Sequence, residues 1–377
     1  MKGKQGMVCM GLLLVLSSCH TGKQITASGL QRKDFQTEVN GQYTDLFTLS
    51  NKQGMEVCIT NYGARVVSIL VPDRNGKRED VVCGFSTITE YMEQRQNFGS
   101  TVGRYIGRIL NARFTLDGVE YKLVPNNGKS GHISHGGNPG FADRIWKVEQ
   151  ADTHRVRLSY LSPDGENGFP GNLKVTLVYS LGEDDNALDL TYEATTDAPT
   201  VLNLSHHSFF NISGNFTKSV EDQQLWVDAD RFTPYDDKKC VTGEYLQVAG
   251  TPLDFRMPHA IGECIDADHP QLKVVNGYDH TWELNTKGDD TRPAAWVYDP
   301  ASGRKMEIFT TEPGMQIYTG NGLKGKMTGK RGIAYPFRSA VCFETMHFQD
   351  SPNQPGFPST VLRPGEVFRS HTVYKFE

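Results

Sequence analysis

Short runs of alternating polar and apolar residues, separated by turn residues, constrain this chain more than any other feature. Residues 174–181 alternate along their whole length, a turn-forming stretch follows, and residues 188–193 alternate again. Side chains on a β-strand point to opposite faces in turn, so this pattern predicts a hairpin with one buried face. Residues 55–71 repeat the arrangement around Gly63, and Asp117-Gly118 predicts another tight turn.

A long helical pattern is missing from the sequence. Apolar residues do not recur with a period of 3.6 over any extended stretch, and the best helical candidate is residues 87–94, capped by Ser86 or Thr87. The 38 Gly and 18 Pro residues are scattered along the chain, as expected for many strands joined by loops. We therefore expect an all-β fold, a large antiparallel β-sandwich or barrel, with residues 34–377 as a single domain.

Composition excludes several classes of protein. The 377 residues are 37% hydrophobic and 22% charged, which is typical of a globular protein with a substantial core. A formal net charge of -5 without a long basic run gives no support for nucleic-acid binding. Beyond Cys9 and Cys19, an odd set of cysteines without a CxxC pair argues against a metal finger or a fully paired disulfide framework. These five are Cys58, Cys83, Cys240, Cys264 and Cys342. Most of them are expected to be small buried apolar residues, and one disulfide is left open.

The first 18 residues read as an export signal. Lys2 and Lys4 precede an apolar run over residues 7–16, which is much shorter than the roughly 20 residues that a membrane span needs. The run ends in Leu-Ser-Ser-Cys19, which resembles the bacterial lipobox. We expect cleavage before Cys19, lipidation of Cys19 and a flexible tether over residues 19–33. The protein would then be anchored to a cell-envelope membrane, either facing the periplasm or at the outer membrane. The alternative is an ordinary secretory peptide with a chance cysteine.

Two ionisable residues stand inside apolar runs. His207 lies within residues 201–211, and Glu344 lies within residues 341–348. Burial of an ionisable side chain costs solvation energy unless the group is paired, so such residues are expected to line a polar cleft. A histidine that faces a glutamate across this cleft is a candidate acid/base pair.

Other polar residues occur in similar strings. Arg108 lies in a glycine-rich stretch, residues 98–109, that lacks the strand-to-helix context of a phosphate-binding loop, so we expect an arginine that donates to hydroxyl groups. His132, His135 and the pair at 206–207 suggest a metal site, but no carboxylate with suitable spacing accompanies them, and we expect no metal. Asp279 and Gln316 add a carboxylate and an amide, and Tyr318 adds a ring of the kind that binds sugars.

Six of these strings, in this order, resemble the aldose 1-epimerase family, also called galactose mutarotases. They are Gly107-Arg108-Ile109, His135-Gly136-Gly137 with Gly140-Phe141 and Trp146, residues 206–211, Gly277-Tyr278-Asp279-His280, residues 313–321, and Glu344-Thr345-Met346. The resemblance spans residues 35–377. It implies a galactose mutarotase-like supersandwich and interconversion of the α and β anomers of aldohexoses such as glucose and galactose. No cofactor is implied, and the partner is an aldose.

The resemblance also implies roles for individual residues. Glu344 corresponds to the general base and His207 to the general acid, whose pKa a flanking carboxylate such as Asp279 is expected to raise. The substrate-binding residues implied are Arg108, His135, Asp279 and Gln316. The sequence departs from the family at His206 and Gly107, where Asn is common, and at Ser134, where Leu often stands. The first two departures are expected to affect which pattern of sugar hydroxyls is preferred.

Three other functions are compatible with some of these features. A glycoside hydrolase needs two carboxylates across the scissile bond, which Glu344 and Asp279 would supply. A non-catalytic sugar-binding lipoprotein would explain the polar cleft but not the pairing of His207 with Glu344. An epimerase for phosphorylated hexoses is disfavoured, because the strings hold no extra Lys or Arg cluster and sugar phosphates are mostly cytosolic.

Overall fold

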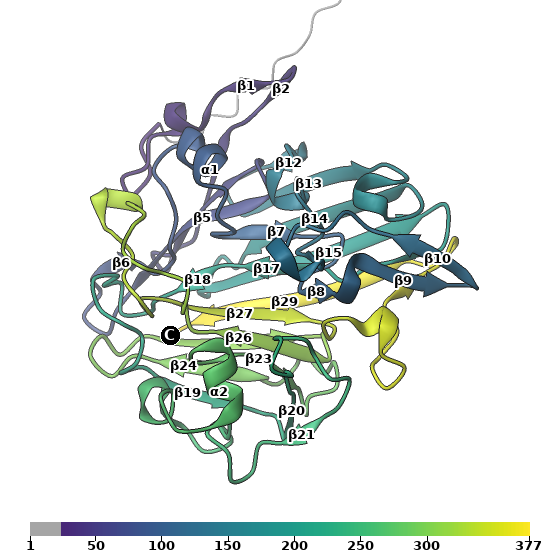
Figure 1. Cartoon of the computed structure of the whole chain (residues 1–377). Helices are drawn as coiled ribbons and strands as arrows, with labels where there is room; N and C mark the ends of the chain where they lie inside the picture. The colour runs from purple at the N-terminus through teal and green to yellow at the C-terminus, as the bar shows by residue number, and fades with distance from the viewer. Residues whose placement is uncertain (1–23) are drawn as a thin grey trace, which may run out of the picture.

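Antiparallel sheets make up most of the computed structural model, which describes residues 24–377 (Figure 1). The largest sheet has nine strands and forms one layer of the molecule. In spatial order its strands are β12 (Lys147–Ala151), β13 (Arg155–Ser162), β14 (Leu173–Leu181), β15 (Ala187–Thr196), β29 (Phe368–Phe376), β25 (Lys305–Thr310), β24 (Ala295–Tyr298), β19 (Gln224–Val227) and β22 (His259–Ala260). The predicted signal peptide, residues 1–18, and the predicted lipidation site Cys19 lie outside the described residues.

Two smaller sheets face the large one. The six-stranded sheet has the order β18 (Phe209–Phe210), β27 (Val341–Met346), β26 (Gly314–Tyr318), β23 (Asp279–Glu283), β20 (Arg231–Thr233) and β21 (Leu246–Gln247). The four-stranded sheet has the order β3 (Leu46–Ser50), β4 (Glu56–Thr60), β5 (Arg65–Pro72) and β6 (Arg78–Asp80). The remaining strands form pairs: β1 (Glu38–Val39) with β2 (Gln42–Tyr43), β7 (Ser100–Val102) with β17 (Ser205–His207), β8 (Arg108–Ile109) with β11 (Ile133–Ser134), β9 (Arg113–Leu116) with β10 (Val119–Lys122), and β16 (Thr200–Val201) with β28 (Val361–Leu362).

The predicted hairpins are confirmed. Strands β14 and β15 pair along their whole length, from Leu173 opposite Thr196 to Leu181 opposite Leu188. Buried and less buried residues alternate along β14, as the sequence pattern requires. Strands β9 and β10 are joined at Asp117 and Gly118, both of which have positive φ, as a type I′ turn demands.

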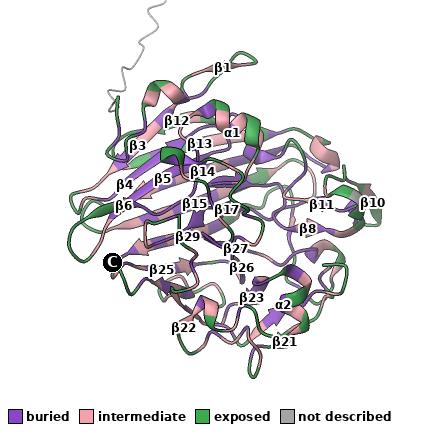
Figure 2. Ribbon diagram, turned by 60° about the vertical axis from the view of Figure 1, so that its left-hand side comes forward, coloured by how far each residue is buried: buried purple, intermediate pink, exposed green. Residues whose placement is uncertain are grey.

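The core lies between the layers, where buried residues follow the strands (Figure 2). Polar side chains also cross from one layer to the other. The Tyr374 hydroxyl on β29 donates to the Phe343 carbonyl on β27 over 3.0 Å, and the hydroxyls of Thr345 and Thr372 lie 2.7 Å apart. These contacts fix the six-stranded sheet against the nine-stranded one. The expected all-β sandwich is therefore confirmed.

Helices are few and short. The α-helices are α1 (Ile88–Gln94) and α2 (Pro270–Val275), and the 3₁₀ turns are η1 (Arg32–Phe35), η2 (Leu110–Ala112), η3 (Gly128–Ser130), η4 (Phe141–Asp143), η5 (Glu166–Gly168), η6 (Ile261–Glu263), η7 (Lys330–Gly332) and η8 (Ser351–Asn353). Helix α1 is the predicted helix, and Thr87 and Glu90 form a reciprocal capping box at its N-terminus. Among residues 24–377 no helix has the length and apolar character to cross a membrane.

The segment just after residue 23 packs on the body of the protein. The hydroxyl of Thr26 accepts a hydrogen bond from the Leu30 amide, and both side chains are buried. The amides of Ala27 and Ser28 donate to the Glu56 carboxylate on β4. Residues 24–33, which composition assigned to a flexible tether, are therefore part of the folded domain. The composition-based expectation was wrong there because small polar side chains can satisfy their own backbone in a turn.

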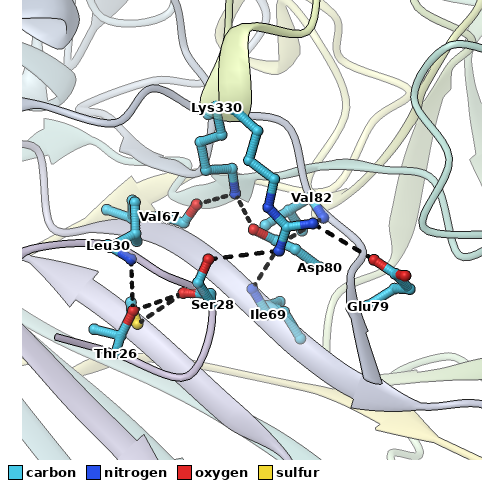
Figure 3. A network of polar contacts seen from close by, with 12 residues as sticks. Thr26, Ser28, Leu30, Val67, Ile69, Glu79, Asp80, Val82 and Lys330 are labelled. Carbon is cyan, nitrogen blue, oxygen red and sulfur yellow. Dashed lines mark hydrogen bonds and ion pairs between the residues drawn. The ribbon is translucent and has the colours of Figure 1, made fainter. Parts of the chain in front are cut away.

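A buried ion pair lies beside this segment (Figure 3). The Lys330 ammonium lies 2.6 Å from the Asp80 carboxylate and also donates to the Val67 carbonyl. The neighbouring Arg331 guanidinium extends from η7 to the Ser28 carbonyl. The N-terminal segment thus contacts η7 as well as β4.

All five cysteines of the described part are free thiols. Cys58, Cys83 and Cys342 are buried, which confirms the expectation that most are small apolar residues, and Cys240 and Cys264 are partly exposed. The disulfide that the sequence left open does not form between them.

Candidate active site

One cleft collects all six predicted site residues. It has a volume of about 260 Å³ and lies where the six-stranded sheet meets the short pairs β7–β17 and β8–β11. The predicted residues that line it are Arg108, His135, His207, Asp279, Gln316 and Glu344. Their strands are far apart in the sequence, so only the folded sandwich brings these side chains together.

His207 and Glu344 form the centre of this cleft. His207 Nε2 lies 3.4 Å from Glu344 Oε1, and the two residues are only 5% and 3% exposed. Glu344 alternates along β27 with Thr345, which faces the large sheet, so the carboxylate points to the opposite side, into the cleft. The Phe209 ring stacks on the His207 ring with centroids 5.1 Å apart. The pair is therefore held in a fixed geometry by its strands and by a ring.

Burial shifts the pKa values of both members toward their neutral forms. It raises the pKa of Glu344 well above the ordinary value for a glutamate, and the Asp279 carboxylate raises it further. Burial also lowers the pKa of His207 well below its ordinary value, and the neighbouring His135 adds to this shift. The expectation that Asp279 raises the pKa of His207 is thus wrong, because the loss of solvation outweighs the attraction of a distant carboxylate.

Strand register places an amide beside the base. Gln316 on β26 is directly opposite Glu344 on β27 and Thr281 on β23. Its Nε2 donates to Asp279 Oδ1 over 2.6 Å, and its Oε1 accepts from the Thr281 hydroxyl. Burial raises the pKa of Asp279. This cluster offers the cleft both acceptor and donor atoms for hydroxyl groups.

The opposite wall of the cleft carries Arg108 and His135 at the ends of the β8–β11 pair. His135 has a positive φ of 53°, and its Nδ1 accepts a hydrogen bond from the Gly107 amide over 3.4 Å. Burial and the Arg108 charge lower the pKa of His135 to about 4, so the ring is neutral at pH 7. With Nδ1 as the acceptor, Nε2 carries the proton and is the donor available to a ligand. Arg108 lies over the Tyr235 ring at 6.0 Å.

Several residues of the cleft were not predicted as site residues. Gln349 follows β27, Gln96 and Asn97 follow α1, and Met346 ends β27. Gln349 stands close to the Glu344 string as a polar residue after an apolar run, which is a usable signal. Gln96 and Asn97 carry no such signal, because they lie in an ordinary polar loop.

His206 does not line the cleft. It is 2% exposed, and its ring faces Tyr179 and Tyr374 of the large sheet. Its Nε2 lies 2.6 Å from the Ser208 hydroxyl. The expectation that His206 affects the preferred hydroxyl pattern was wrong, because neighbouring residues of a strand face opposite sides and His207 takes the cleft side.

One group of possible metal ligands includes the central pair. Nitrogen, sulfur and oxygen atoms of His207, Cys342 and Glu344 lie within 4.8 Å of one another in the described part of the chain. Cys342 is buried and does not line the cleft, and burial raises the pKa of its thiol well above the ordinary value. A neutral thiol is a poor ligand compared with a thiolate, so the donor set fits a resident metal badly.

Known proteins show the same sequence pattern and the same fold. A sequence profile of the aldose 1-epimerase family matches residues 45–375. The chain belongs to the aldose 1-epimerase family. It is 40% identical to a galactose mutarotase from Bos taurus over 88% of this chain and 93% of that protein. It is 36% identical to an aldose 1-epimerase from Escherichia coli K12 over 89% of this chain and 96% of that protein.

Solved structures agree with this assignment. The crystal structure of an aldose epimerase homologue from C. elegans superposes with a TM-score of 0.81 at 31% identity, covering 89% of this chain and 99% of that one. A galactose 1-epimerase from Lactobacillus acidophilus gives a TM-score of 0.78 at 28% identity, over 91% and 97% of the two chains. The chain is thus an isomerase that interconverts sugar anomers, and the cleft around His207 and Glu344 is its candidate active site.

Proposed function

We propose that this enzyme interconverts the α and β anomers of aldohexoses such as glucose and galactose, with Glu344 as the general base and His207 as the general acid. The observation that carries the proposal is the buried pair, with Nε2 and Oε1 3.4 Å apart, inside a cleft whose other groups suit sugar hydroxyls. Arg108, His135, Asp279 and Gln316 would bind the hydroxyls that do not react. A hydrolase mechanism, with two carboxylates across a bond, gives no role to the buried histidine.

Ring opening needs two proton transfers. Glu344 takes the proton from the anomeric O1 hydroxyl while His207 gives a proton to the ring oxygen O5, and the C1–O5 bond breaks to leave an aldehyde. Rotation about the bond between C1 and C2 then presents the other face of the aldehyde to O5. Closure returns the proton of O5 to His207 and that of Glu344 to O1, so the pair ends as it began.

The proton count of the pair shows which step of the reaction burial favours. The pair holds one transferable proton in either of two states. In the charged pair the proton is on His207 and Glu344 is ionised, and in the neutral pair the proton is on Glu344. Ring opening converts the first into the second. Because burial favours the neutral forms of both groups, it favours the open-chain state with its neutral pair over the closed sugar with the charged pair. The same burial disfavours the charged pair that begins the reaction, so it favours the proton transfer of ring opening without by itself lowering the barrier.

Polarimetry on freshly dissolved α-D-glucose and α-D-galactose tests the proposal. The purified protein should speed the approach to anomeric equilibrium. His207→Asn and Glu344→Gln should each slow the catalysed rate by about 10² to 10⁴-fold, the usual contribution of a well-placed acid or base. Substitution at Lys238, exposed on a loop outside the cleft, serves as a control. A wild-type protein that matches buffer with every aldose tried would refute the activity, and active variants would refute the roles.

We also propose that Cys19 is lipidated and that the enzyme acts at the cell envelope on sugars released by glycan breakdown outside the cytoplasm. The Leu-Ser-Ser-Cys19 string after a short apolar run supports this. Cys19→Ser should move the protein from the membrane fraction to the soluble fraction with unchanged specific activity. Equal membrane association of both forms would contradict lipidation at Cys19.

A further inference from the structure

Gln349 occupies a position in the cleft that none of the sequence strings indicated. It lies between β27 and η8, lines the same cleft as Glu344, and is 4% exposed. Its Nε2 donates to the Tyr235 hydroxyl over 2.6 Å and lies 3.3 Å from Gln316 Oε1. A polar side chain with this degree of burial needs defined partners, and these contacts supply them for one end of the amide only.

A relay of hydrogen bonds fixes which end of the Gln349 amide faces the cleft. Asp279 Oδ1 accepts from Gln316 Nε2, so Gln316 turns its oxygen toward Gln349. Gln349 must then present its NH₂ group to Gln316, which leaves its Oε1 as the free end. Within residues 24–377 no protein group donates to this oxygen, and it is not among the fully buried unpaired atoms. The oxygen is therefore an acceptor directed to the cleft.

Gly107 makes room for this side chain. Its φ is +77°, and a Cβ placed there would lie 2.6 Å from Gln349 Cγ and 3.2 Å from Cδ, much closer than carbon atoms tolerate. The Gly107 amide and carbonyl also bond His135, which anchors the backbone in place. A side chain at position 107 and the observed position of Gln349 therefore exclude each other. The departure from the family pattern at Gly107 thus acts through the neighbour that fills the space.

We propose that Gln349 is a substrate-binding residue that helps to set sugar specificity, and that its amide oxygen accepts a hydrogen bond from one hydroxyl of the aldose. Asp279 and Gln316 orient the amide, and Gly107 admits it. This inference rests on the proposed function, because it takes an aldose as the ligand. Gln349 Oε1 would be a hydrogen-bond acceptor in the cleft in addition to the carboxylates and the Gln316 amide.

Single-deoxy sugars test the inference. The 2-, 3-, 4- and 6-deoxy derivatives of D-glucose keep the anomeric hydroxyl and the ring oxygen, so all of them can mutarotate. Gln349→Met keeps the length of the side chain and removes the amide. We expect it to raise KM by about 10-fold for glucose and for every derivative except one, the derivative that lacks the contacted hydroxyl. Gln354→Met, the same change in an adjacent loop outside the cleft, should leave all KM values unchanged.

The dependence on Gly107 gives a second measurement. Gly107→Ala should raise KM for glucose because its Cβ displaces Gln349. Added to Gln349→Ala, the same change should have a much smaller effect, because the colliding Cγ is gone while any backbone strain at position 107 remains. Equal effects of Gly107→Ala in both backgrounds would assign the change to strain and overturn the coupling.

The outcomes separate this inference from the function it rests on. A wild-type protein without activity on any aldose would refute the proposed function. An active wild type in which Gln349→Met changes KM equally for all five sugars, or for none, would leave the function standing and refute the role of Gln349. Circular dichroism and the thermal midpoint of each variant show whether it has folded.

Discussion

Residues in the cleft act through the environment that surrounds them. The Asp279 carboxylate raises the pKa of Glu344 beyond the effect of burial alone. The active pair holds one proton, so activity should fall at low pH when His207 takes a second proton and at high pH when the pair loses its last one. Replacing Asp279 with the neutral Asn should therefore shift mainly the basic limb of the pH profile of kcat, which is set by the last proton of the pair.

Asp279→Asn tests the effect of this carboxylate on Glu344. In Asp279→Asn the carboxylate that raises the pKa of Glu344 is gone, so the pKa of Glu344 falls and the pair loses its last proton at a lower pH. The basic limb of the kcat profile should move to lower pH. Polarimetry across pH 5 to 10 measures the limb, and a limb that stays in place or moves to higher pH would contradict the coupling. The maximal value of kcat does not test this coupling, since Asp279 also lines the substrate cleft and its loss can change the rate directly.

Sequence strings indicated the residues of the site only in part. His207 and Glu344 were detectable because each stands as an ionisable group among apolar neighbours. Gln349 carries a weaker signal, as a polar residue after an apolar run, but its role could not be predicted, since that role depends on contacts with Gly107 and Gln316 that only the fold creates. The direction of the His207 pKa shift was not predicted, because local sequence does not show how completely the fold removes solvent from the ring.

Elements were predictable where one local rule decides them. Alternation set the β14–β15 hairpin, and the Thr87 cap set the start of α1. The packing of residues 24–33 was missed because their composition is that of a linker and their burial comes from contacts with β4 and η7. Local patterns therefore predicted these strands and α1, but not α2 or which segments pack together.

The capping box at the N-terminus of α1 should contribute measurably to stability. Thr87→Ala removes the hydroxyl that accepts from the Glu90 amide. The free energy of unfolding should fall by about 1 kcal/mol, the usual cost of losing an N-cap. Urea unfolding measures this, with Thr291→Ala in an exposed turn as the control. Because the loop after α1 supplies Gln96 and Asn97 to the cleft, KM should rise slightly as well.

The His371 side chain makes the stability of the protein depend on pH. Hydrogen bonds from His371 on β29 to Asp189 on β15, and to Asp290, raise the pKa of His371 to about 9. A raised pKa means that the folded state binds the proton more tightly than the unfolded chain, whose histidines titrate near 6.5. The added stability is thus fully present below about pH 6.5 and is lost as pH rises through 9.

The size of this effect is modest because the three groups are partly exposed. We expect about 1 to 2 kcal/mol after solvent screening. His371→Asn should therefore be less stable than the wild type at pH 6 and nearly as stable at pH 10, as measured by urea unfolding at both values. A stability difference that grows with pH would contradict this account.

The whole molecule combines two layers of sheet with an N-terminal segment that packs on them. Leu30 and Phe35 are buried, and the Phe35 ring lies 6.5 Å from Tyr91 of α1. A chain shortened to begin at residue 36 should lose about 3 kcal/mol or more, because each large apolar side chain contributes roughly 1.5 to 3 kcal/mol. A chain that begins at residue 24 is the control. Equal thermal midpoints for the two would show that the segment adds nothing to stability.

The docked segment would also set how far the enzyme can stand from a membrane if Cys19 carries a lipid, as proposed above. Along the sequence only five residues, 19–23, precede Gln24, whose carbonyl accepts a hydrogen bond from the Arg32 amide. Five residues reach at most about 18 Å when fully extended. A lipid-anchored enzyme with so short a connection would stay close to the membrane surface. It would meet its sugars in the thin layer of solvent above the headgroups, where its effective supply is set by what diffuses along that surface.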